Sequence, residues 1–271
     1  MATVAISDDI SIGDGKDLVL LAGPCQIESL DHCLLVCEEI KKATRDLPIQ
    51  FVFKSSYDKA NRTSGQAQRG PGLEHGLEIL AQVKEQMQVP VVTDVHTAQD
   101  VTLVAEVVDI VQIPAFLCRQ TDLLIAAGKT GRAINIKKGQ FLHPLDMQYC
   151  VEKIVSTGNK KSICCERGTC HGYRDLVVDM RSLQLMKGLG VPVVFDATHS
   201  VQSMGGAGGS SSGSREFVPM LARAALAAGI DGLFLEVHDN PDQAPSDGPN
   251  MLPLSDLQPL VTKLCAIREV L

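Results

Sequence analysis

Short apolar runs alternate with longer amphipathic stretches along almost the whole chain. The runs are nearly continuous in Val, Ile, Leu and Phe, which is typical of strands buried on both faces. Eight such runs are expected to be strands, and they are Leu18–Ala22, Gln50–Phe53, Pro90–Thr93, Ile110–Ile113, Ala133–Ile136, Ser162–Cys165, Pro192–Phe195 and Gly232–Leu235.

Each run is followed by a stretch whose apolar residues recur at helical spacing. These eight predicted helices are Asp31–Arg45, Leu73–Met87, Ala98–Val107, Gln120–Ala127, Leu145–Ser156, Leu176–Lys187, Ser214–Ala228 and Ser255–Glu269. Strict alternation of strand and helix predicts right-handed βαβ units and a parallel sheet. Eight units favour one closed (β/α)8 TIM barrel, in a single domain over residues 1–271, over an open doubly wound sheet.

Two segments fall outside this rhythm. Thr3–Ile6 and Asp9–Ile12 roughly alternate polar and apolar residues, so residues 1–15 are predicted to form a β-hairpin that caps the barrel. Gly205–Gly213 is rich in glycine and serine, and we expect it to be a mobile loop after the seventh strand rather than a domain boundary.

Composition narrows the class of protein. A net charge of −7 argues against nonspecific nucleic-acid binding, which needs a basic surface. The first residues lack a basic and apolar signal pattern, and no apolar run approaches the ~20 residues of a membrane span. The nine cysteines are an odd number without a Cys-x-x-Cys pair, which favours reduced thiols. We therefore expect a cytoplasmic protein with neither membrane nor nucleic acid as partner.

A dense cationic stretch, Phe53–Ser64, follows the second apolar run. It contains Lys54, Lys59 and Arg62 with hydroxyl residues between and after them. Lysines act as point charges and arginine offers a planar fork of donors, so this composition suits phosphates and carboxylates. A solvated basic turn would have the same composition, and the stretch by itself leaves both interpretations open.

Polar or reactive residues stand near the end of every predicted strand. In a (β/α)8 barrel the carboxyl ends of the strands carry the chemistry. These residues are Cys25, Lys54, Asp94, Gln112, Lys137, Glu166 with Arg167, His199 and Glu236. A barrel rim is polar in any case, so one such residue indicates little. Three cations converging from different strands, Lys54, Lys137 and Arg167, predict a bound anion, because like charges held together are costly.

A second constellation consists of Cys25, His199, Glu236 and Asp247. A thiolate, an imidazole and two carboxylates suit Zn²⁺ or Fe²⁺. The four are far apart in sequence, and each has a structural alternative, such as a packed thiol, a rim histidine or a turn-forming aspartate. His238, two residues after Glu236, would share its face if the strand continues, so it is a further candidate ligand or base.

Two patterns resemble functional motifs without their key residues. The glycine-rich Gly205–Gly209 lacks the Gly-Lys-Ser/Thr of a phosphate-binding loop. Cys164 and Cys165 lie within a predicted strand, so their side chains are expected to face opposite ways and to pack.

Several longer stretches closely resemble the 3-deoxy-D-manno-octulosonate 8-phosphate synthase family. They are Leu21–Cys25 with Ile27–Ser29, Lys54–Ser64, Gln112–Asp122, Asn135–Gln140, Glu166–Thr169, Asp196–Ser200 and Glu236–Asp239. The resemblance extends over the chain from about Leu18. The sister family, 3-deoxy-D-arabino-heptulosonate 7-phosphate synthase, typically has Lys-Pro-Arg-Thr where this chain has Lys59-Ala60-Asn61-Arg62-Thr63.

The resemblance implies a transferase of Kdo and lipopolysaccharide biosynthesis that condenses phosphoenolpyruvate with D-arabinose 5-phosphate and releases phosphate. It implies that phosphoenolpyruvate is held by Lys54, Lys59, Lys137 and Arg167, with backbone near Ala115. It places arabinose 5-phosphate on Asn61, Arg62 and Thr63, and Asp94 and Gln112 in the same cavity. Arg119 would reach the sugar phosphate from a neighbouring subunit of a homotetramer. The catalytic group implied is Lys54, Lys59, Asp94, Lys137 and His199.

The family has metal-dependent and metal-independent forms, with Cys and Asn respectively at the position of Cys25. The match of Cys25, His199, Glu236 and Asp247 implies the dependent form, with Zn, Fe or Mn as cofactor. The chain departs from the family at His171, where Phe is usual, and in the serine-rich Gly205–Gly213 segment. The heptulosonate synthase, a metal-dependent aldolase and an inactive ligand-sensing relative remain the alternatives.

Overall fold

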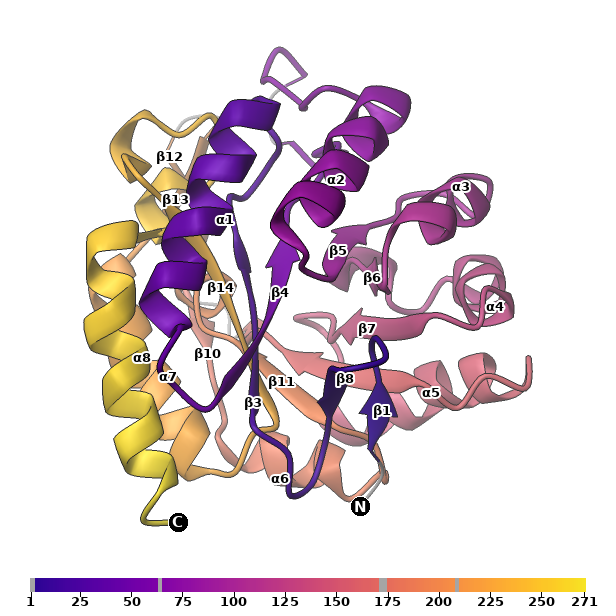
Figure 1. Ribbon diagram of the computed structural model, residues 1–271. Helices are drawn as coiled ribbons and strands as arrows, with labels where there is room; N and C mark the ends of the chain where they lie inside the picture. The colour runs from indigo at the N-terminus through magenta and orange to yellow at the C-terminus, as the bar shows by residue number, and fades with distance from the viewer. Residues whose placement is uncertain (1–2, 63–64, 171–174, 208–209) are drawn as a thin grey trace.

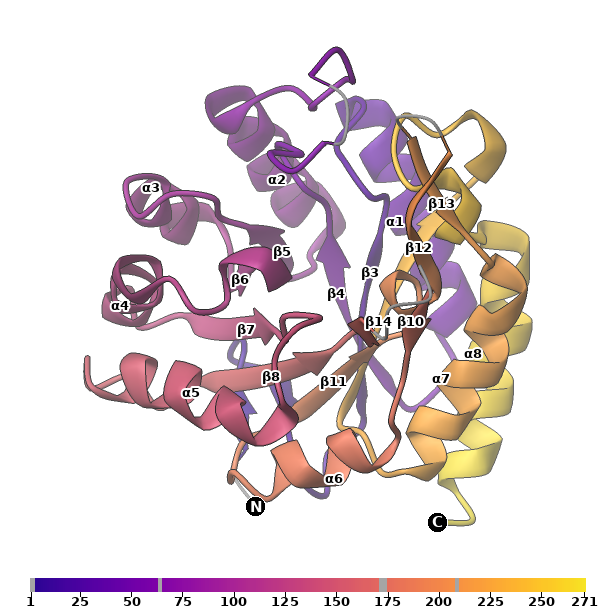
Figure 2. The same cartoon turned by 180° about the vertical axis from the view of Figure 1, so that it is seen from behind.

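The computed structural model describes residues 3–62, 65–170, 175–207 and 210–271. Its centre is a ring of eight parallel strands, in which β11 pairs with both β8 and β14 and so closes the sheet into a barrel (Figures 1 and 2). The barrel strands are β3 (Leu18–Gly23), β4 (Ile49–Lys54), β5 (Val91–Asp94), β6 (Ile110–Ile113), β7 (Ala133–Lys137), β8 (Ser162–Glu166), β11 (Val193–Asp196) and β14 (Gly232–His238). The predicted (β/α)8 barrel is confirmed.

Eight helices surround the ring (Figure 1). They are α1 (Leu30–Thr44), α2 (Leu73–Met87), α3 (Asp100–Val107), α4 (Thr121–Lys129), α5 (Met147–Val155), α6 (Arg181–Lys187), α7 (Val218–Ala227) and α8 (Leu254–Arg268). The last helix, α8, contacts both α7 and α1, so the helical layer closes together with the sheet. None of the described helices is both long and apolar enough to cross a membrane.

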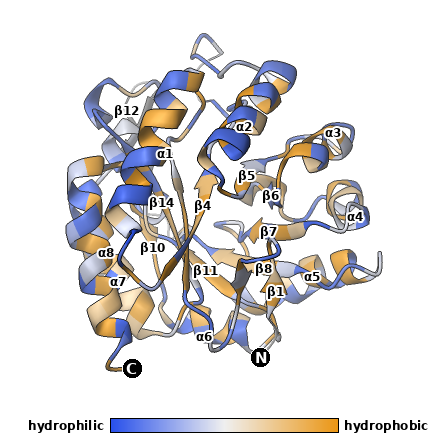
Figure 3. Ribbon diagram, viewed as in Figure 1, coloured by the Kyte–Doolittle hydropathy of each residue, from blue (hydrophilic) through white to orange (hydrophobic). Residues whose placement is uncertain are grey.

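Side-chain alternation along the strands divides the core into two layers. In β3, Val19 and Leu21 point into the barrel, whereas Leu18 and Leu20 pack outward against the helices. Hydropathy colouring shows the same arrangement, with apolar strands inside and polar positions on the outer helices (Figure 3). Cys164 belongs to the outer layer and Cys165 to the inner one, so the two thiols face opposite ways as predicted.

The N-terminal hairpin, β1 (Val4–Ala5) with β2 (Ser11–Ile12), plugs the barrel at the amino ends of its strands. Ile12 is fully buried there. It lies so close to Gly232, at the start of β14, that a Cβ on this glycine would be 3.0 Å from Ile12 Cδ1. The predicted capping hairpin is thus confirmed, and Gly232 gives it room.

The sixth helix was predicted to begin at Leu176, and this start is wrong. Leu176–Val177 is instead β10, which pairs antiparallel with β9 (Thr169–Cys170). The helix begins only at Arg181, two residues after Asp179, whose side chain accepts a hydrogen bond from the Arg181 N–H at 3.0 Å. The apolar residues before Asp179 therefore belong to a strand rather than to a helical face.

The expected loop at Gly205–Gly213 is a β-ribbon, which corrects a second prediction. β12 (Gln202–Ala207) and β13 (Ser210–Gly213) pair antiparallel, with residues 208–209 outside the described part. Gly213 lies tightly against Asn250, and a Cβ there would be 1.4 Å from Asn250 Oδ1. Close packing against a distant segment stabilises this strand, which its own composition does not favour.

Short elements complete the rim. The strand β15 (Leu252–Pro253) extends the sheet parallel to the end of β14. The described parts of the connections contain six 3-10 turns, and they are η1 (Ala115–Leu117), η2 (Pro144–Asp146), η3 (His199–Val201), η4 (Arg215–Phe217), η5 (Pro241–Gln243) and η6 (Gly248–Asn250).

Candidate active site

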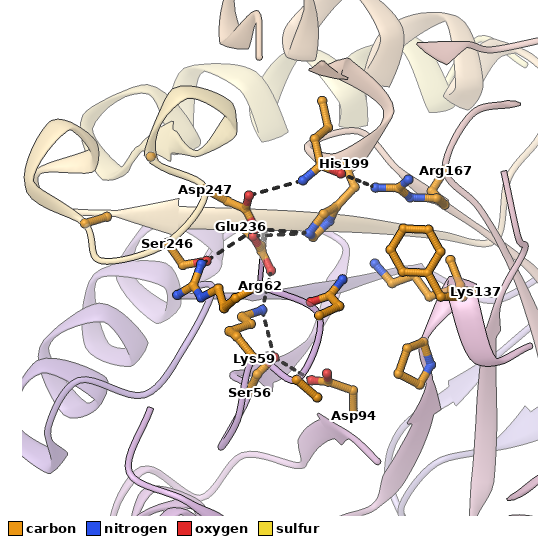
Figure 4. Close-up of a pocket in the computed structure, with 18 of the residues that line it drawn as sticks. Ser56, Lys59, Arg62, Asp94, Lys137, Arg167, His199, Glu236, Ser246 and Asp247 are labelled. Atoms are coloured by element: carbon orange, nitrogen blue, oxygen red, sulfur yellow. Dashed lines mark hydrogen bonds and ion pairs between the residues drawn. The ribbon is translucent and has the colours of Figure 1, made fainter. Parts of the chain in front are cut away.

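A cavity of about 620 Å³ opens at the carboxyl ends of the barrel strands (Figure 4). Most of the residues predicted for the site line it, and they are Lys54, Lys59, Asn61, Arg62, Asp94, Gln112, Ala115, Lys137, Arg167, His199, Glu236 and Asp247. Cys25 is fully buried at its edge, with Sγ 3.3 Å from Asp247 Oδ2. Thr63 and His171 lie outside the described residues. Arg119 is exposed just before α4 and is not part of the cavity lining.

Two of the three converging cations are neutralised within the protein. Lys54 Nζ donates to Glu236 Oε1 at 2.6 Å and to the Cys25 carbonyl at 3.0 Å. Lys137 Nζ pairs with Asp196 and lies 3.3 Å from the centroid of the Phe234 ring, a cation–π contact. Sequence reasoning expected an external anion to hold these charges, but buried carboxylates already do so.

Arg167 is the cation that keeps a free donor. Its side chain is 4% exposed, and Nη2 donates to Gln202 Oε1 at 2.8 Å. Nη1 is buried without a hydrogen-bond partner. A buried donor left unsatisfied costs about 1–3 kcal/mol, and more when it is charged. Arg167 lines the cavity together with Lys137 (Figure 4), so this nitrogen is a donor that an anion in the cavity could satisfy.

A hydrogen-bonded chain runs from Lys59 to the end of β5. Lys59 Nζ donates to Ser56 Oγ at 3.0 Å, and Ser56 in turn donates to Asp94. His96 Nε2 lies 3.1 Å from the other oxygen of Asp94. Burial alone would raise the pKa of Asp94, but His96 and Lys59 outweigh it and hold this pKa well below its usual range. Ser56 and His96 were not among the predicted site residues. Each follows a predicted strand-end residue, Lys54 or Asp94, by two positions, just beyond the end of β4 or β5.

Arg62 ties the cationic stretch to the loop after β14. Its Nη1 donates to Ser246 Oγ at 2.6 Å, and its Nη2 donates to Gln26 Oε1 at 2.6 Å. Asn61 is exposed at the mouth of the cavity. The stretch is therefore one wall of the cavity and not a solvated turn.

The four candidate metal ligands, which we call the inner cluster, come together from distant segments. The donor atoms of Cys25, Glu236 and Asp247 all lie within 4.8 Å of one another. His199 Nε2 lies 3.5 Å from Glu236 Oε2 and 3.9 Å from Asp247 Oδ2. Asp247 adopts a left-handed backbone conformation with φ of 52°, a strained choice for a residue other than glycine and one that clusters at functional sites.

Asp196 orients the imidazole of the inner cluster. Its Oδ2 lies 2.7 Å from His199 Nδ1, and its Oδ1 accepts from the His199 backbone N–H at 2.9 Å. A carboxylate on one ring nitrogen directs the other toward a metal, here Nε2 toward Glu236. Burial alone would raise the pKa of Asp196, but His199 and Lys137 hold it well below its ordinary value. Asp196 ends β11 as Asp94 ends β5, so its strand-end position was the signal available in the sequence.

The chemistry of the inner cluster fits a divalent transition metal. Glu236 Oε2 is buried without a hydrogen-bond partner. Burial and the nearby Glu236 charge raise the pKa of the Cys25 thiol well above its usual value. A cation between these groups would relieve both penalties, since metals bind the thiolate and favour ionised carboxylates. The mixed sulfur, nitrogen and oxygen donors suit Zn²⁺ or Fe²⁺ rather than Mg²⁺.

Two strand-end residues do not join the cavity. Glu166 faces α6, where it accepts from the Gly168 N–H at 2.7 Å and from Ser182 Oγ at 2.6 Å. His238 lies on the outer side of the rim, with Nε2 2.8 Å from Glu28 Oε1. The strand continues through His238, but His238 does not share the cavity with Glu236, and its ring contacts Glu28 and His32 beside the start of α1.

Comparison with known proteins gives a consistent result. Residues 1–270 match the model of the DAHP synthetase I family. A Cyanothece protein called 2-dehydro-3-deoxyphosphooctonate aldolase is 57% identical over 271 residues, which is all of this chain and 99% of the relative. Proteins of the same name from a Synechococcus strain and from Geobacter metallireducens are 59% and 56% identical, over 97% of this chain and 93% and 96% of their own.

Proposed function

The chain belongs to the DAHP synthetase I family, and we propose that it condenses phosphoenolpyruvate with D-arabinose 5-phosphate. With water as third reactant, the products are 3-deoxy-D-manno-octulosonate 8-phosphate, a precursor of Kdo and lipopolysaccharide, and inorganic phosphate. The observation that carries the proposal is one cavity that combines Lys59, Lys137 and the unpartnered Arg167 nitrogen with the inner cluster. Relatives more than half identical over nearly their full length carry the name of this activity.

The cationic wall would hold phosphoenolpyruvate. Arg167 Nη1 is the free donor for one of its anionic groups, while Lys54, Lys59 and Lys137 supply positive charge and the Ala115 backbone lies at the edge of the cavity. Asn61, Arg62 and Thr63 would hold the sugar phosphate. Of these, Asn61 and Arg62 line the cavity, as Gln112 does, while Thr63 lies outside the described residues. Paired placement of two anionic substrates lowers the entropic cost of bringing them together.

The chain's own groups account for the course of the reaction. C3 of phosphoenolpyruvate forms a bond to the aldehyde carbon, water adds at C2, and the bond between C2 and the phosphate oxygen breaks. Preorganised cations stabilise the charge that develops on carboxylate and phosphate. The chain Lys59, Ser56 and Asp94 reaches into the cavity and is placed to hold a proton beside the reacting atoms.

Cys25, His199, Glu236 and Asp247 would hold a divalent Zn, Fe or Mn ion. When bound, such an ion supplies Lewis-acid polarisation of a substrate oxygen and lowers the pKa of water. The support for this placement is the donor set itself and the orienting contact of Asp196 with His199. This arrangement corresponds to the metal-dependent form of the enzyme.

We further propose a cytoplasmic homotetramer in which Arg119 completes the site of a neighbouring subunit. Arg119 is exposed, and its carbonyl accepts from Lys153 Nζ of α5 at 3.1 Å. Large apolar side chains on the nearby surface are about half exposed, with Phe116 at 47% and Tyr149 at 52%. An exposed apolar patch of this kind supports an interface. All nine cysteines are free, which is consistent with a reducing compartment.

The decisive experiment measures phosphate release from phosphoenolpyruvate with two acceptors, each with and without a chelator. Arabinose 5-phosphate should support turnover, and erythrose 4-phosphate should give little. Faster release with erythrose 4-phosphate would reassign the chain to the heptulosonate activity. Binding of phosphoenolpyruvate without release with either acceptor would indicate an inactive ligand-sensing protein.

A further inference from the structure

A second group of potential ligands lies outside the cavity, between the end of β14 and the start of α1. We call it the outer cluster, and it consists of Glu28, His32, His238 and Asp239. His238 is the last residue of β14 and is buried, while Glu28 immediately precedes the cap of α1. None of its members belongs to the inner cluster, and the catalytic roles proposed above do not use it.

Local structure at the start of α1 fixes two of these residues. Ser29 is the N-cap, and its side chain accepts from the His32 backbone N–H at 3.1 Å. This hydrogen bond sets the first helical turn. Glu28 and His32 are four residues apart, and the turn brings Glu28 Oε1 to 3.8 Å from His32 Nδ1.

Two imidazole nitrogens and a carboxylate oxygen converge on one point. His238 Nε2 lies 2.8 Å from Glu28 Oε1, and the two imidazole centroids are 4.7 Å apart. All three donor atoms lie within 4.8 Å of one another. His32 Nδ1 is buried and has no hydrogen-bond partner. A buried nitrogen lone pair aimed at a histidine and a glutamate is placed to bind a cation.

Asp239 contacts the opposite edges of both rings. Its Oδ1 lies 3.0 Å from His32 Nε2 and 3.0 Å from His238 Nδ1. Histidine ligands commonly donate their second nitrogen to a carboxylate, which fixes the tautomer and presents the first nitrogen to the metal. In the metal-bound form, one carboxylate would serve both rings in this way. Both inner-facing nitrogens are thereby directed toward Glu28.

We propose that Glu28, His32 and His238 form a second metal site, oriented by Asp239, for a divalent transition metal such as Zn²⁺. Two imidazoles with a carboxylate favour zinc, copper or nickel over magnesium and calcium. In the metal-free protein the Asn240 N–H donates to His238 Nδ1 at 2.9 Å, so Nε2 carries the proton and donates to Glu28. When a metal binds Nε2, the proton displaced from Nε2 moves to Nδ1, which gives up the hydrogen bond from the Asn240 N–H and donates to Asp239 instead.

If both sites bind metal, each chain holds two ions, one on the outer cluster and one at the proposed catalytic site. Stoichiometry therefore tests the outer site separately from the catalytic metal. Metal-stripped full-length protein is titrated with Zn²⁺ by calorimetry, and bound zinc is measured by elemental analysis after gel filtration. Wild type should retain two ions and His32→Gln one. The matched control is His75→Gln, because His75 pairs with Glu78 at 3.2 Å on the exposed face of α2, and it should retain two ions.

Cobalt distinguishes the two sites by spectrum. Co²⁺ bound to Cys25 gives a thiolate-to-metal charge-transfer band in the near ultraviolet, whereas Co²⁺ on the outer cluster gives none. Cys25→Ala should therefore keep one ion without the band, and His32→Gln should keep one ion with it. Asp239→Asn should bind the outer ion about 10–100-fold more weakly, because the orienting carboxylate is lost.

Thermal unfolding of each metal-free variant verifies that it folds. A wild type that binds a single ion with the thiolate band would overturn the outer site, as would a His32→Gln variant that still binds two. Equal loss of zinc in His75→Gln would show nonspecific surface binding and would also overturn it. A single ion without the band would support the outer site and contradict the catalytic metal instead.

Discussion

The inner and outer clusters share two chain segments, yet they lie in different environments. Glu28 follows Cys25 by three residues, and His238 follows Glu236 by two. The Glu236 side chain is fully buried beside Lys54, whereas the Glu28 and Asp239 side chains are 31% and 48% exposed. The inner cluster combines sulfur, nitrogen and oxygen donors beside a substrate-sized cavity. The outer cluster has no thiol and lies outside that cavity.

This difference shows how one end of a barrel can present two kinds of chemistry. Inside, Glu236 is paired with the buried Lys54 and Asp196 with the buried Lys137. Burial alone would raise the pKa of Glu236, but His199 and Lys54 hold it low. Breaking such a pair is costly because a charge is left without water or partner. In the outer cluster, solvent screens the exposed carboxylates, so the loss of one ion-pair contact lowers the free energy of unfolding only a little. Four measurements test this contrast, beginning with the largest expected effect.

Metal removal should separate the clusters most strongly. A chelator is expected to lower phosphate release at least about 100-fold, because a catalytic metal contributes several kcal/mol of transition-state stabilisation and about 1.4 kcal/mol is tenfold in rate. Zn²⁺, Fe²⁺ or Mn²⁺ should restore it. The His32→Gln variant should respond in the same way, since the outer cluster is not catalytic. Undiminished turnover after exhaustive metal removal would contradict the catalytic role of the inner cluster.

Removing a carboxylate from the inner cluster should destabilise the protein far more than removing one from the outer cluster. In Glu236→Gln the buried Lys54 loses its ion pair at 2.6 Å, and the free energy of unfolding should fall by about 3–5 kcal/mol. Glu28→Gln changes a more exposed contact and should cost less than about 1 kcal/mol. Denaturant titration of the metal-stripped proteins measures both. Equal losses would mean that the two environments do not differ as described.

The Cys25→Asn substitution tests which of the two clusters needs the Cys25 thiolate to bind its metal ion. An asparagine amide can donate to Asp247 Oδ2 and Ser246 Oγ, which the thiol contacts at 3.3 and 3.2 Å, so the fold should persist. The inner ion should be lost and the outer ion retained. We expect reduced turnover that a chelator no longer affects, and a phosphate-release assay with and without chelator measures it. A folded Cys25→Asn variant with no activity would show that this one substitution does not convert the metal-dependent form into a metal-independent one.

His96, which lies beside Asp94 and belongs to neither cluster, should titrate and not bind metal. Burial alone would lower the pKa of His96, but its hydrogen bond to Asp94 raises it above the ordinary value of about 6.5. Its stabilising contribution is therefore fully present below about pH 6.5 and is lost as the pH rises through the higher folded pKa. Relative to wild type, His96→Gln should lose less stability at pH 8 than at pH 6. NMR titration of the His96 ring, which zinc should leave unchanged, provides the direct measurement, and a midpoint below 6.5 would contradict the prediction.

Much of the fold could be predicted because it depends on local patterns. The eight apolar runs match the eight barrel strands to within a few residues at each end, and α2 spans the predicted Leu73–Met87. Failures occurred where a contact with another segment decided the outcome. Gly213 packs against Asn250, and Leu176–Val177 pairs with Thr169–Cys170, so α6 begins only at Arg181.

The sequence alone determined the barrel and the types of residue at its strand ends, because burial on both faces and side-chain alternation act within a few neighbours along the chain. Only the tertiary structure decided the partners of those residues. It paired Lys54 with Glu236 and Lys137 with Asp196, left Arg167 Nη1 unpartnered, and turned His238 away from the cavity toward Glu28. The physical reason is that barrel closure joins segments more than two hundred residues apart, and pairing energies depend on distances and burial that no local pattern contains.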